Sequence, residues 1–113
     1  MNYEVFTTET FERRIKKLYK KYLQIKADCK EFVTELKQGN IYGDRLSGFK
    51  GLNLYKERVK SQDQSRGKRG GFRVIYYVDQ DRSEIFLLTI YCKSEKENIS
   101  KEEILKILQD CNV

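Results

Sequence analysis

The segment Ile85–Tyr91, with the sequence IFLLTIY, constrains the fold of this chain more than any other stretch. Apolar residues fill it almost without interruption, whereas a strand with one solvated face alternates apolar and polar residues. Such a run predicts a central strand that is covered on both faces. We therefore expect a layered fold around this strand.

Two further strands are expected before it. The runs Leu54–Lys60 and Phe72–Val78 are strand-like, and every second side chain of a strand lies on the same face. Lys56 and Arg58 accordingly share one face of the first run, and Arg73 lies on one face of the second. The short polar stretch after Val78 predicts a hairpin that makes the last two strands antiparallel neighbours.

Elsewhere the apolar spacing changes to that of helices. Tyr3–Thr7 is an expected opening strand, and the runs Phe11–Tyr22 and Ile25–Leu36 predict a helical hairpin. A capping box at Ser100 and Glu103 predicts a final helix. The apolar stripe expected in the core of the first helix is Phe11, Ile15, Leu18, Tyr19 and Tyr22.

This order of elements predicts an α+β fold, in which an N-terminal strand and a helical hairpin pack on a small, mainly antiparallel sheet, followed by a C-terminal helix. A chain of 113 residues suits one domain, which we expect to span 1–113. No apolar run approaches the roughly 18 residues of a membrane helix, and the N-terminus lacks a secretory pattern. We therefore expect a soluble, cytoplasmic protein without a membrane partner.

The sequence favours neither metal nor disulfide chemistry. Its three cysteines, Cys29, Cys92 and Cys111, lack C-x-x-C spacing. The chain has no histidine, which is the commonest metal ligand and the commonest general base. Any catalysis has to use Lys, Arg, Tyr, Glu or Asp, and we expect no metal and no cofactor.

The net charge of +6 is unevenly distributed. Residues 45–73 contain nine cations and two anions, a net charge of +7, so the rest of the chain sums to −1. This polarity favours a polyanionic partner, with nucleic acid first and an anionic membrane a distant second. The alternative is that the lysine-rich loops only keep a small protein soluble.

A basic, glycine-rich segment leads into the strand that begins at Phe72. Its cations before that strand are Arg66, Lys68 and Arg69, and its glycines are Gly67, Gly70 and Gly71. Glycines permit tight turns that expose backbone N–H groups, and the cations add positive charge, which together suit an RNA phosphate backbone. The glycines precede a strand rather than a helix, so this is not a P-loop. An ordinary hairpin loop with a basic tip is the alternative.

Two motifs together carry a family resemblance: RGKRGGFRVIYY at residues 66–77 and LLTIYCKS at residues 87–94. At this spacing the chain resembles the RelE/ParE toxin superfamily, in particular its HigB-like branch. The resemblance implies the toxin of a type II toxin–antitoxin system, with a RelE-like fold. It further implies an endoribonuclease that cuts messenger RNA in the ribosomal A site, uses no metal, and is silenced by a cognate antitoxin. We expect the free toxin to be a monomer.

The resemblance also suggests roles for particular residues. The expected catalytic residues are Lys56, Arg58, Arg73 and Lys93, and the expected RNA-binding residues are Arg66, Lys68, Arg69, Tyr77, Tyr91 and Lys96. An arginine fork can hold a phosphate through two hydrogen bonds, and clustered cations stabilise the extra charge formed when a 2′-hydroxyl attacks phosphorus. The alternatives are a charged edge strand for Lys56 and Arg58, a half-buried sheet tyrosine for Tyr77, and a solvated loop lysine for Lys93.

The chain departs from the best-known RelE pattern at two positions. Ser94 stands where that pattern has an arginine, and Ser100 stands where it has a tyrosine. Lys93, Glu95, Lys96 or Tyr91 are candidates to replace those groups. Two other functions stay open from the sequence: a ParE-like protein that poisons DNA gyrase without cutting RNA, and a non-catalytic RNA-binding module.

Overall fold

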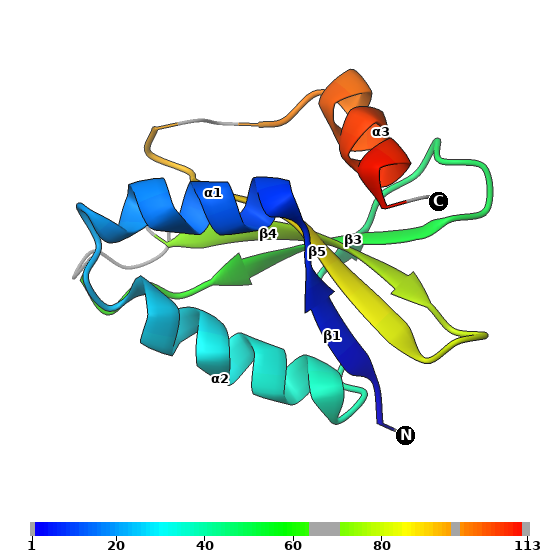
Figure 1. Cartoon of the computed structure of the whole chain (residues 1–113), viewed down its shortest axis with the longest axis horizontal. Helices are drawn as coiled ribbons and strands as arrows, with labels where there is room; N and C mark the ends of the chain where they lie inside the picture. Colours follow the sequence, from blue (N-terminus) through cyan, green and yellow to red (C-terminus); the bar gives the residue numbers. More distant parts are fainter. Residues whose placement is uncertain (1, 64–70, 96–97, 112–113) are drawn as a thin grey trace.

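The structure, a computed structural model, describes residues 2–63, 71–95 and 98–111. It has the predicted α+β architecture. None of the helices in these ranges is long and apolar enough to cross a membrane. The elements in chain order are β1 (Glu4–Thr7), α1 (Glu9–Tyr19), α2 (Ile25–Lys37), β2 (Asp44–Arg45), β3 (Asn53–Val59), β4 (Phe72–Asp79), β5 (Glu84–Cys92) and α3 (Lys101–Asp110) (Figure 1).

The described strands form one sheet in the order β1-β5-β4-β3-β2. Neighbouring strands pair antiparallel except for β1, which lies parallel to β5. Helices α1 and α2 cover one face of the sheet and α3 covers the other, so β5 lies between two layers (Figure 1). Ile85, Leu88 and Ile90 have no exposed surface, which confirms the prediction drawn from the apolar run.

Each face of the sheet has its own apolar core. Under α1 and α2, Phe32 and Tyr55 pack on Tyr76, whose ring is fully buried. Under α3, Ile104 and Leu108 pack against the opposite face. Burying one large apolar side chain contributes about 1.5–3 kcal/mol, so both layers hold the sheet in place.

Two details differ from the expectation. The short strand β2, Asp44–Arg45, was not predicted, because two residues are too few to show a period in sequence. Tyr19 was expected in the core but is 41% exposed. At about 100° per residue it lies about 80° around the helix from Phe11, at the border of the apolar stripe. Lys26 Nζ lies 4.5 Å from the centre of its ring.

Helix α1 covers an edge of β5 that has no strand partner. Strand β1 pairs only with the residues up to Leu87, which leaves the later β5 carbonyls without a β1 neighbour. The Thr8 hydroxyl lies within hydrogen-bond distance of the carbonyls of Leu87 (3.0 Å) and Leu88 (2.9 Å), and accepts from the Phe11 N–H at 3.1 Å. Arg14 Nε donates to the Ile90 carbonyl at 3.3 Å. These bonds fix the helix along the edge.

We expect Thr8→Ala to lower the free energy of unfolding by about 1–3 kcal/mol, because it removes both the helix cap and a donor to β5. The matched control is Thr10→Ala, which removes a threonine within the same helix turn. Urea unfolding of both variants checks this prediction. Equal midpoints for the two variants would contradict it.

Candidate active site and nucleic-acid interface

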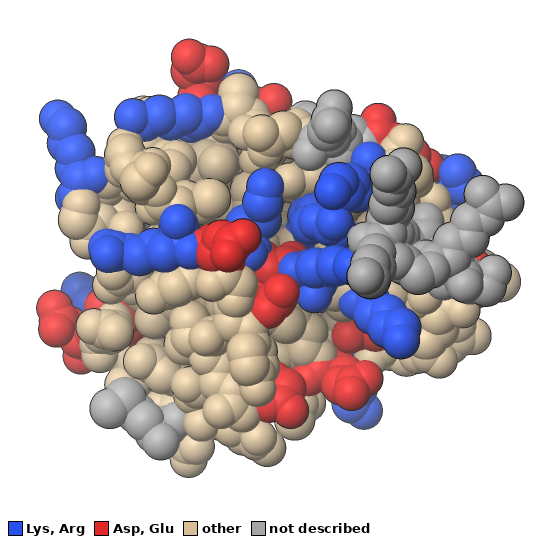
Figure 2. Space-filling model, turned by 180° about the vertical axis from the view of Figure 1, so that it is seen from behind, with Lys and Arg blue, Asp and Glu red and all other residues tan. Residues whose placement is uncertain are grey.

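Strand pairing brings the predicted cations together. Arg58 of β3 pairs with Arg73 of β4, and Arg73 pairs with Tyr91 of β5. Paired residues share a face and neighbouring strands lie about 4.8 Å apart, so these side chains cross the sheet in a line on the α3 side. Lys56 lies on the same face, two residues before Arg58. We call Lys56, Arg58 and Arg73 the cation row. Seen from behind the view of Figure 1, the surface carries Lys and Arg side chains across its middle, with some Asp and Glu side chains among them (Figure 2).

The members of the cation row differ in their exposure. Arg58 is exposed, whereas Lys56 and Arg73 are half-buried. Arg73 Nη1 donates to the carbonyl of its neighbour Phe72 at 3.4 Å. Half-buried Lys and Arg side chains pack their apolar stems and keep the charged end toward water. The row is therefore a set of cations held on a rigid sheet.

Tyr91 ends this line as a buried hydrogen-bond donor. The residue is 1% exposed, and among the described residues its hydroxyl has no hydrogen-bond partner. Burial raises the pKa of Tyr91, and the positive charge of Arg73 partly opposes that rise. The hydroxyl therefore keeps its proton at neutral pH. An unsatisfied buried polar group costs about 1–3 kcal/mol, which a bound acceptor would recover.

The other predicted cations lie around the row or outside the described part of the chain. Lys93 is exposed and follows β5 directly. Arg66, Lys68, Arg69 and Lys96, with Gly67 and Gly70, lie outside the described residues. The segment that carries the first three leaves β3 after Val59 and rejoins β4 at Phe72, next to Arg58 and Arg73.

Tyr77 lies apart from Arg73 and nearer to Lys56. It lies on the same face as Arg73 but four residues farther along β4, about 13 Å away, whereas its partner on β3 is Leu54, two residues before Lys56. Its ring stacks on Phe86 with centroids 6.2 Å apart, and Phe86 stacks in turn on Phe6 at 5.3 Å. Burial raises the pKa of Tyr77. Tyr77 thus belongs to a row of aromatic rings across β4, β5 and β1.

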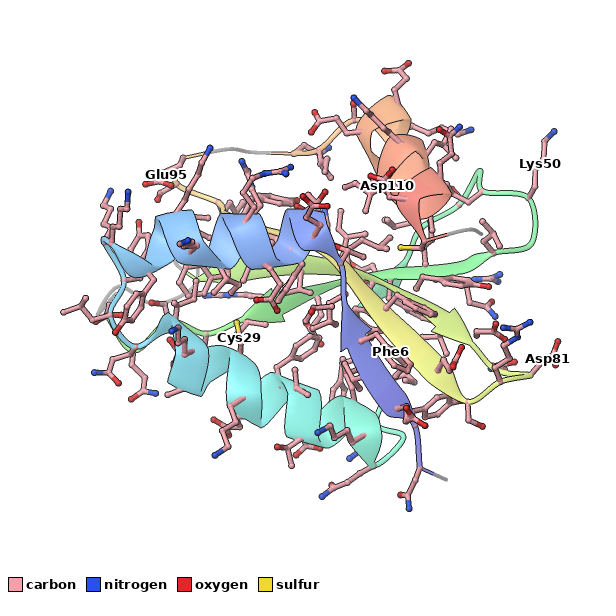
Figure 3. All side chains as sticks on the ribbon, in the orientation of Figure 1. Phe6, Cys29, Lys50, Asp81, Glu95 and Asp110 are labelled. Carbon is pink, nitrogen blue, oxygen red and sulfur yellow. The ribbon has the colours of Figure 1, made fainter. Side chains whose placement is uncertain are left out.

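The segments before and after β5 lie at opposite ends of the molecule. Figure 3 shows Asp81, in the turn before β5, far from Glu95, which follows the strand. The cation row lies toward the Glu95 end, because Arg73 pairs with Tyr91 near the end of β5. Tyr77 lies toward the Asp81 end.

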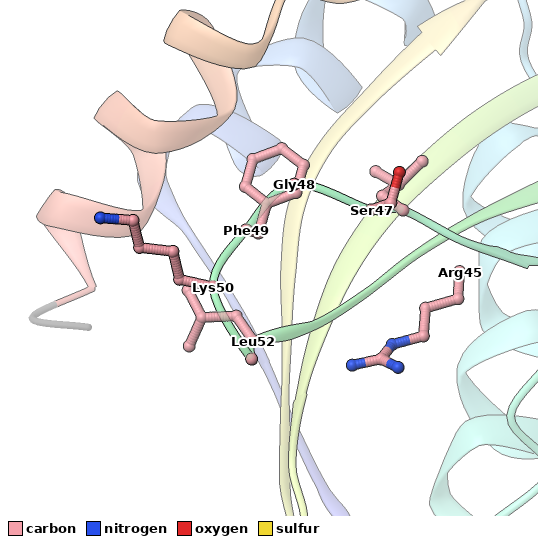
Figure 4. A pocket seen from close by; sticks show the side chains of 8 residues that line it. Arg45, Ser47, Gly48, Phe49, Lys50 and Leu52 are labelled. Atoms are coloured by element: carbon pink, nitrogen blue, oxygen red, sulfur yellow. The ribbon is translucent and has the colours of Figure 1, made fainter.

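A hollow of about 280 Å³ in the loop between β2 and β3 is separate from the cation row. Residues 45–52 line it (Figure 4). The loop enters β3 at Asn53, three residues before Lys56 and five before Arg58, separations of about 10 Å and about 16 Å along the strand. No residue of the cation row lines this hollow.

Two glycines allow the backbone to pack closely beside the row. A Cβ atom on Gly43, at φ +102°, would lie 2.3 Å from the carbonyl oxygen of Lys56, and one on Gly71, at φ +93°, 2.7 Å from that of Val59. Gly71 was expected as a turn glycine, whereas no role was predicted for Gly43. At both positions only a residue without a Cβ atom fits.

The chemistry of the described site rests on cations and a phenol. Within the described ranges, no group of three or more His, Cys, Asp and Glu side chains is placed to hold a metal ion. Ser94 Oγ lies 3.1 Å from Cys92 Sγ, and Ser100 caps α3 by accepting the Glu103 N–H at 3.2 Å. Ser100 therefore has a structural role in the helix.

Comparisons with known proteins agree with this architecture. The family model described as the RelE toxin of the RelE/RelB toxin-antitoxin system matches residues 3–111. A solved structure of an E. coli RelE toxin mutant in the free state is also similar, with a TM-score of 0.61 and 20% sequence identity. The match covers 94% of this chain and 97% of that chain. At this identity, the structural likeness establishes a shared fold.

We expect Gly43→Ala to destabilise the protein more than Gly51→Ala does. Both glycines have positive φ, so an alanine costs about 1–2 kcal/mol at either position. Nothing lies within 4 Å of a Cβ on Gly51, whereas the one on Gly43 meets the Lys56 backbone. The overlap should add about 1–3 kcal/mol in urea unfolding. Equal losses would show that the close approach costs nothing.

Proposed function

This chain belongs to the RelE toxin family, and we propose that it is the toxin of a type II toxin–antitoxin system and cuts messenger RNA on the ribosome. The family model covers almost the whole chain, residues 3–111. The spacing of the two motifs at residues 66–77 and 87–94 supports a place in the HigB-like branch. We also propose that residues 1–113 form a single toxin domain.

The observation that carries this proposal is the cation row beside the buried Tyr91 hydroxyl. RNA cleavage by its own 2′-oxygen forms a bond from that oxygen to phosphorus and breaks the bond to the 5′-oxygen. The phosphorus passes through a five-coordinate state with extra negative charge, and fixed cations stabilise that charge more than the ground state. A preformed row of cations on a rigid sheet suits this requirement.

Each member of the site has a proposed part. Arg73, half-buried between β3 and β5, holds two phosphate oxygens with its guanidinium fork. Lys56 and Arg58 approach the same phosphate from β3 and either clamp it or help to deprotonate the 2′-hydroxyl. Lys93 adds charge from beyond β5. The Tyr91 hydroxyl, which stays protonated, donates a hydrogen bond to the RNA.

The surrounding cations would bind neighbouring phosphates. Arg66, Lys68 and Arg69 belong to a segment whose two ends leave the sheet next to the row, and Lys96 follows β5 closely. About 13 Å along β4, Tyr77 offers a ring that would stack on a base of another nucleotide. Binding to these residues should depend strongly on salt.

The partners follow from family membership and charge. The RelE/RelB system implies a cognate antitoxin, and an acidic or amphipathic segment laid over the cation row would block the phosphate site. The substrates would be messenger RNA and the ribosomal A site, in the cytoplasm. We propose that the free toxin is a monomer.

Mapping of messenger RNA 5′ ends after induction tests this function. The wild type should produce cuts in phase with codons that require translation. Arg73→Ala should reduce them about 100-fold to 1000-fold, the usual effect of removing one transition-state donor. Arg82→Ala is the matched control, because it removes an arginine from the far end of the same hairpin and should leave cleavage unchanged.

Other outcomes would identify a different function. DNA breaks and filamenting cells with intact messages would indicate a gyrase poison. Tight RNA binding without any cleavage would indicate a non-catalytic module. Equal cleavage by Arg73→Ala and the wild type would remove Arg73 from the site.

A further inference from the structure

Helix α1 has a second group of cations that the charge count over residues 45–73 leaves out. Arg14, Lys17 and Lys21 follow one another at i, i+3 and i+7, with the half-buried Leu18 between them. This spacing places them on one side of the helix and its C-terminal extension. They line a cavity of about 160 Å³ together with Leu18, Tyr91, Cys92 and Glu95.

The cavity adjoins the cation row through Tyr91. Its walls are helix α1 on one side and the end of β5 with the following turn on the other. Arg14 is fixed there by its bond to the Ile90 carbonyl at 3.3 Å. Tyr91 lines the cavity, and it also pairs across the sheet with Arg73. The line of side chains formed by Arg58, Arg73 and Tyr91 therefore ends at this cavity.

The charges of the cavity favour an anion. It has three cations, Arg14, Lys17 and Lys21, and one carboxylate, Glu95. Lys21 Nζ lies 3.2 Å from Glu95 Oε1, an exposed ion pair of the kind that contributes little to stability. The hydrogen bond to Glu95 is the main cause that raises the pKa of Lys21. A phosphate can replace Glu95 as the partner of Lys21.

The size of the cavity limits what it can hold. Its volume equals about five water molecules at about 30 Å³ each. A phosphate group with a few waters fits this space, whereas a peptide helix of about 10–12 Å diameter does not. Tyr91 is one of the residues that line the cavity, and its buried hydroxyl has no hydrogen-bond partner among the described residues.

We propose that this cavity binds a phosphate of the RNA substrate close to the one that is cleaved. The inference rests on the proposed function and adds a second phosphate position to it. Arg58 and Tyr91 are two strand spacings apart, about 10 Å, so a group bound beyond Tyr91 is separate from the phosphate held between Arg58 and Arg73. Two fixed phosphates would set the register of the RNA across the site.

The test measures binding of a single-stranded RNA oligonucleotide, with 2′-O-methyl groups that prevent cleavage, over a range of salt concentrations. The affinity falls as the salt concentration rises. In Lys17→Ala, the plot of log affinity against log salt should be less steep by about 0.7, the effect of losing one phosphate contact. Lys16→Ala is the matched control. Both lysines are exposed in the last turn of α1, but Lys16 does not line the cavity. Lys17→Arg should restore the slope.

The outcomes separate this inference from the proposed function. A wild type that cuts messenger RNA, with equal slopes for Lys17→Ala and Lys16→Ala, would overturn the cavity and leave the nuclease intact. A wild type that neither binds the oligonucleotide nor cuts messenger RNA would overturn both. A poly-glutamate peptide serves as a carboxylate probe. If Lys17→Ala weakened its binding and left RNA binding unchanged, the cavity would be assigned to an acidic protein partner instead.

Discussion

The pairing register of β4 with its two neighbours is the constraint on which the rest of the structure depends. Shifting a strand by one residue moves every side chain to the opposite face. In the observed register, Phe72 and Val74 are fully buried under α1 and α2, and Arg73 between them faces the α3 side. The apolar core therefore fixes where the charged side chains lie, although none of them contributes to that core.

This register places Arg58 directly opposite Arg73, and like charges in facing positions destabilise a sheet. The Tyr91 hydroxyl next to them is buried without a partner among the described residues, which is a second cost. Folded proteins usually tolerate such conflicts between local rules where the arrangement serves a function. The two apolar cores supply the stability against which this site is maintained.

Much of the fold could be predicted from the sequence. The strands of the central hairpin, the helical hairpin and the Ser100 cap are local patterns, and the structure confirms them. The parallel pairing of β1 was not predicted, because it depends on contacts between residues about 80 positions apart. The cavity on α1 was missed because residues outside 45–73 sum to −1 and hide the local excess of Arg14, Lys17 and Lys21.

The bonds from Thr8 and Arg14 to the edge of β5 have a consequence for how this protein meets other copies of itself. An uncovered strand edge is a template onto which another chain can add a strand. Here β1 has four residues and β2 two, and the longer open stretch of β5 lies under α1. At the β5 edge, the described sheet thus exposes little backbone for edge-to-edge aggregation. This protection comes from the placement of a helix, in a chain that contains no proline to block strand addition.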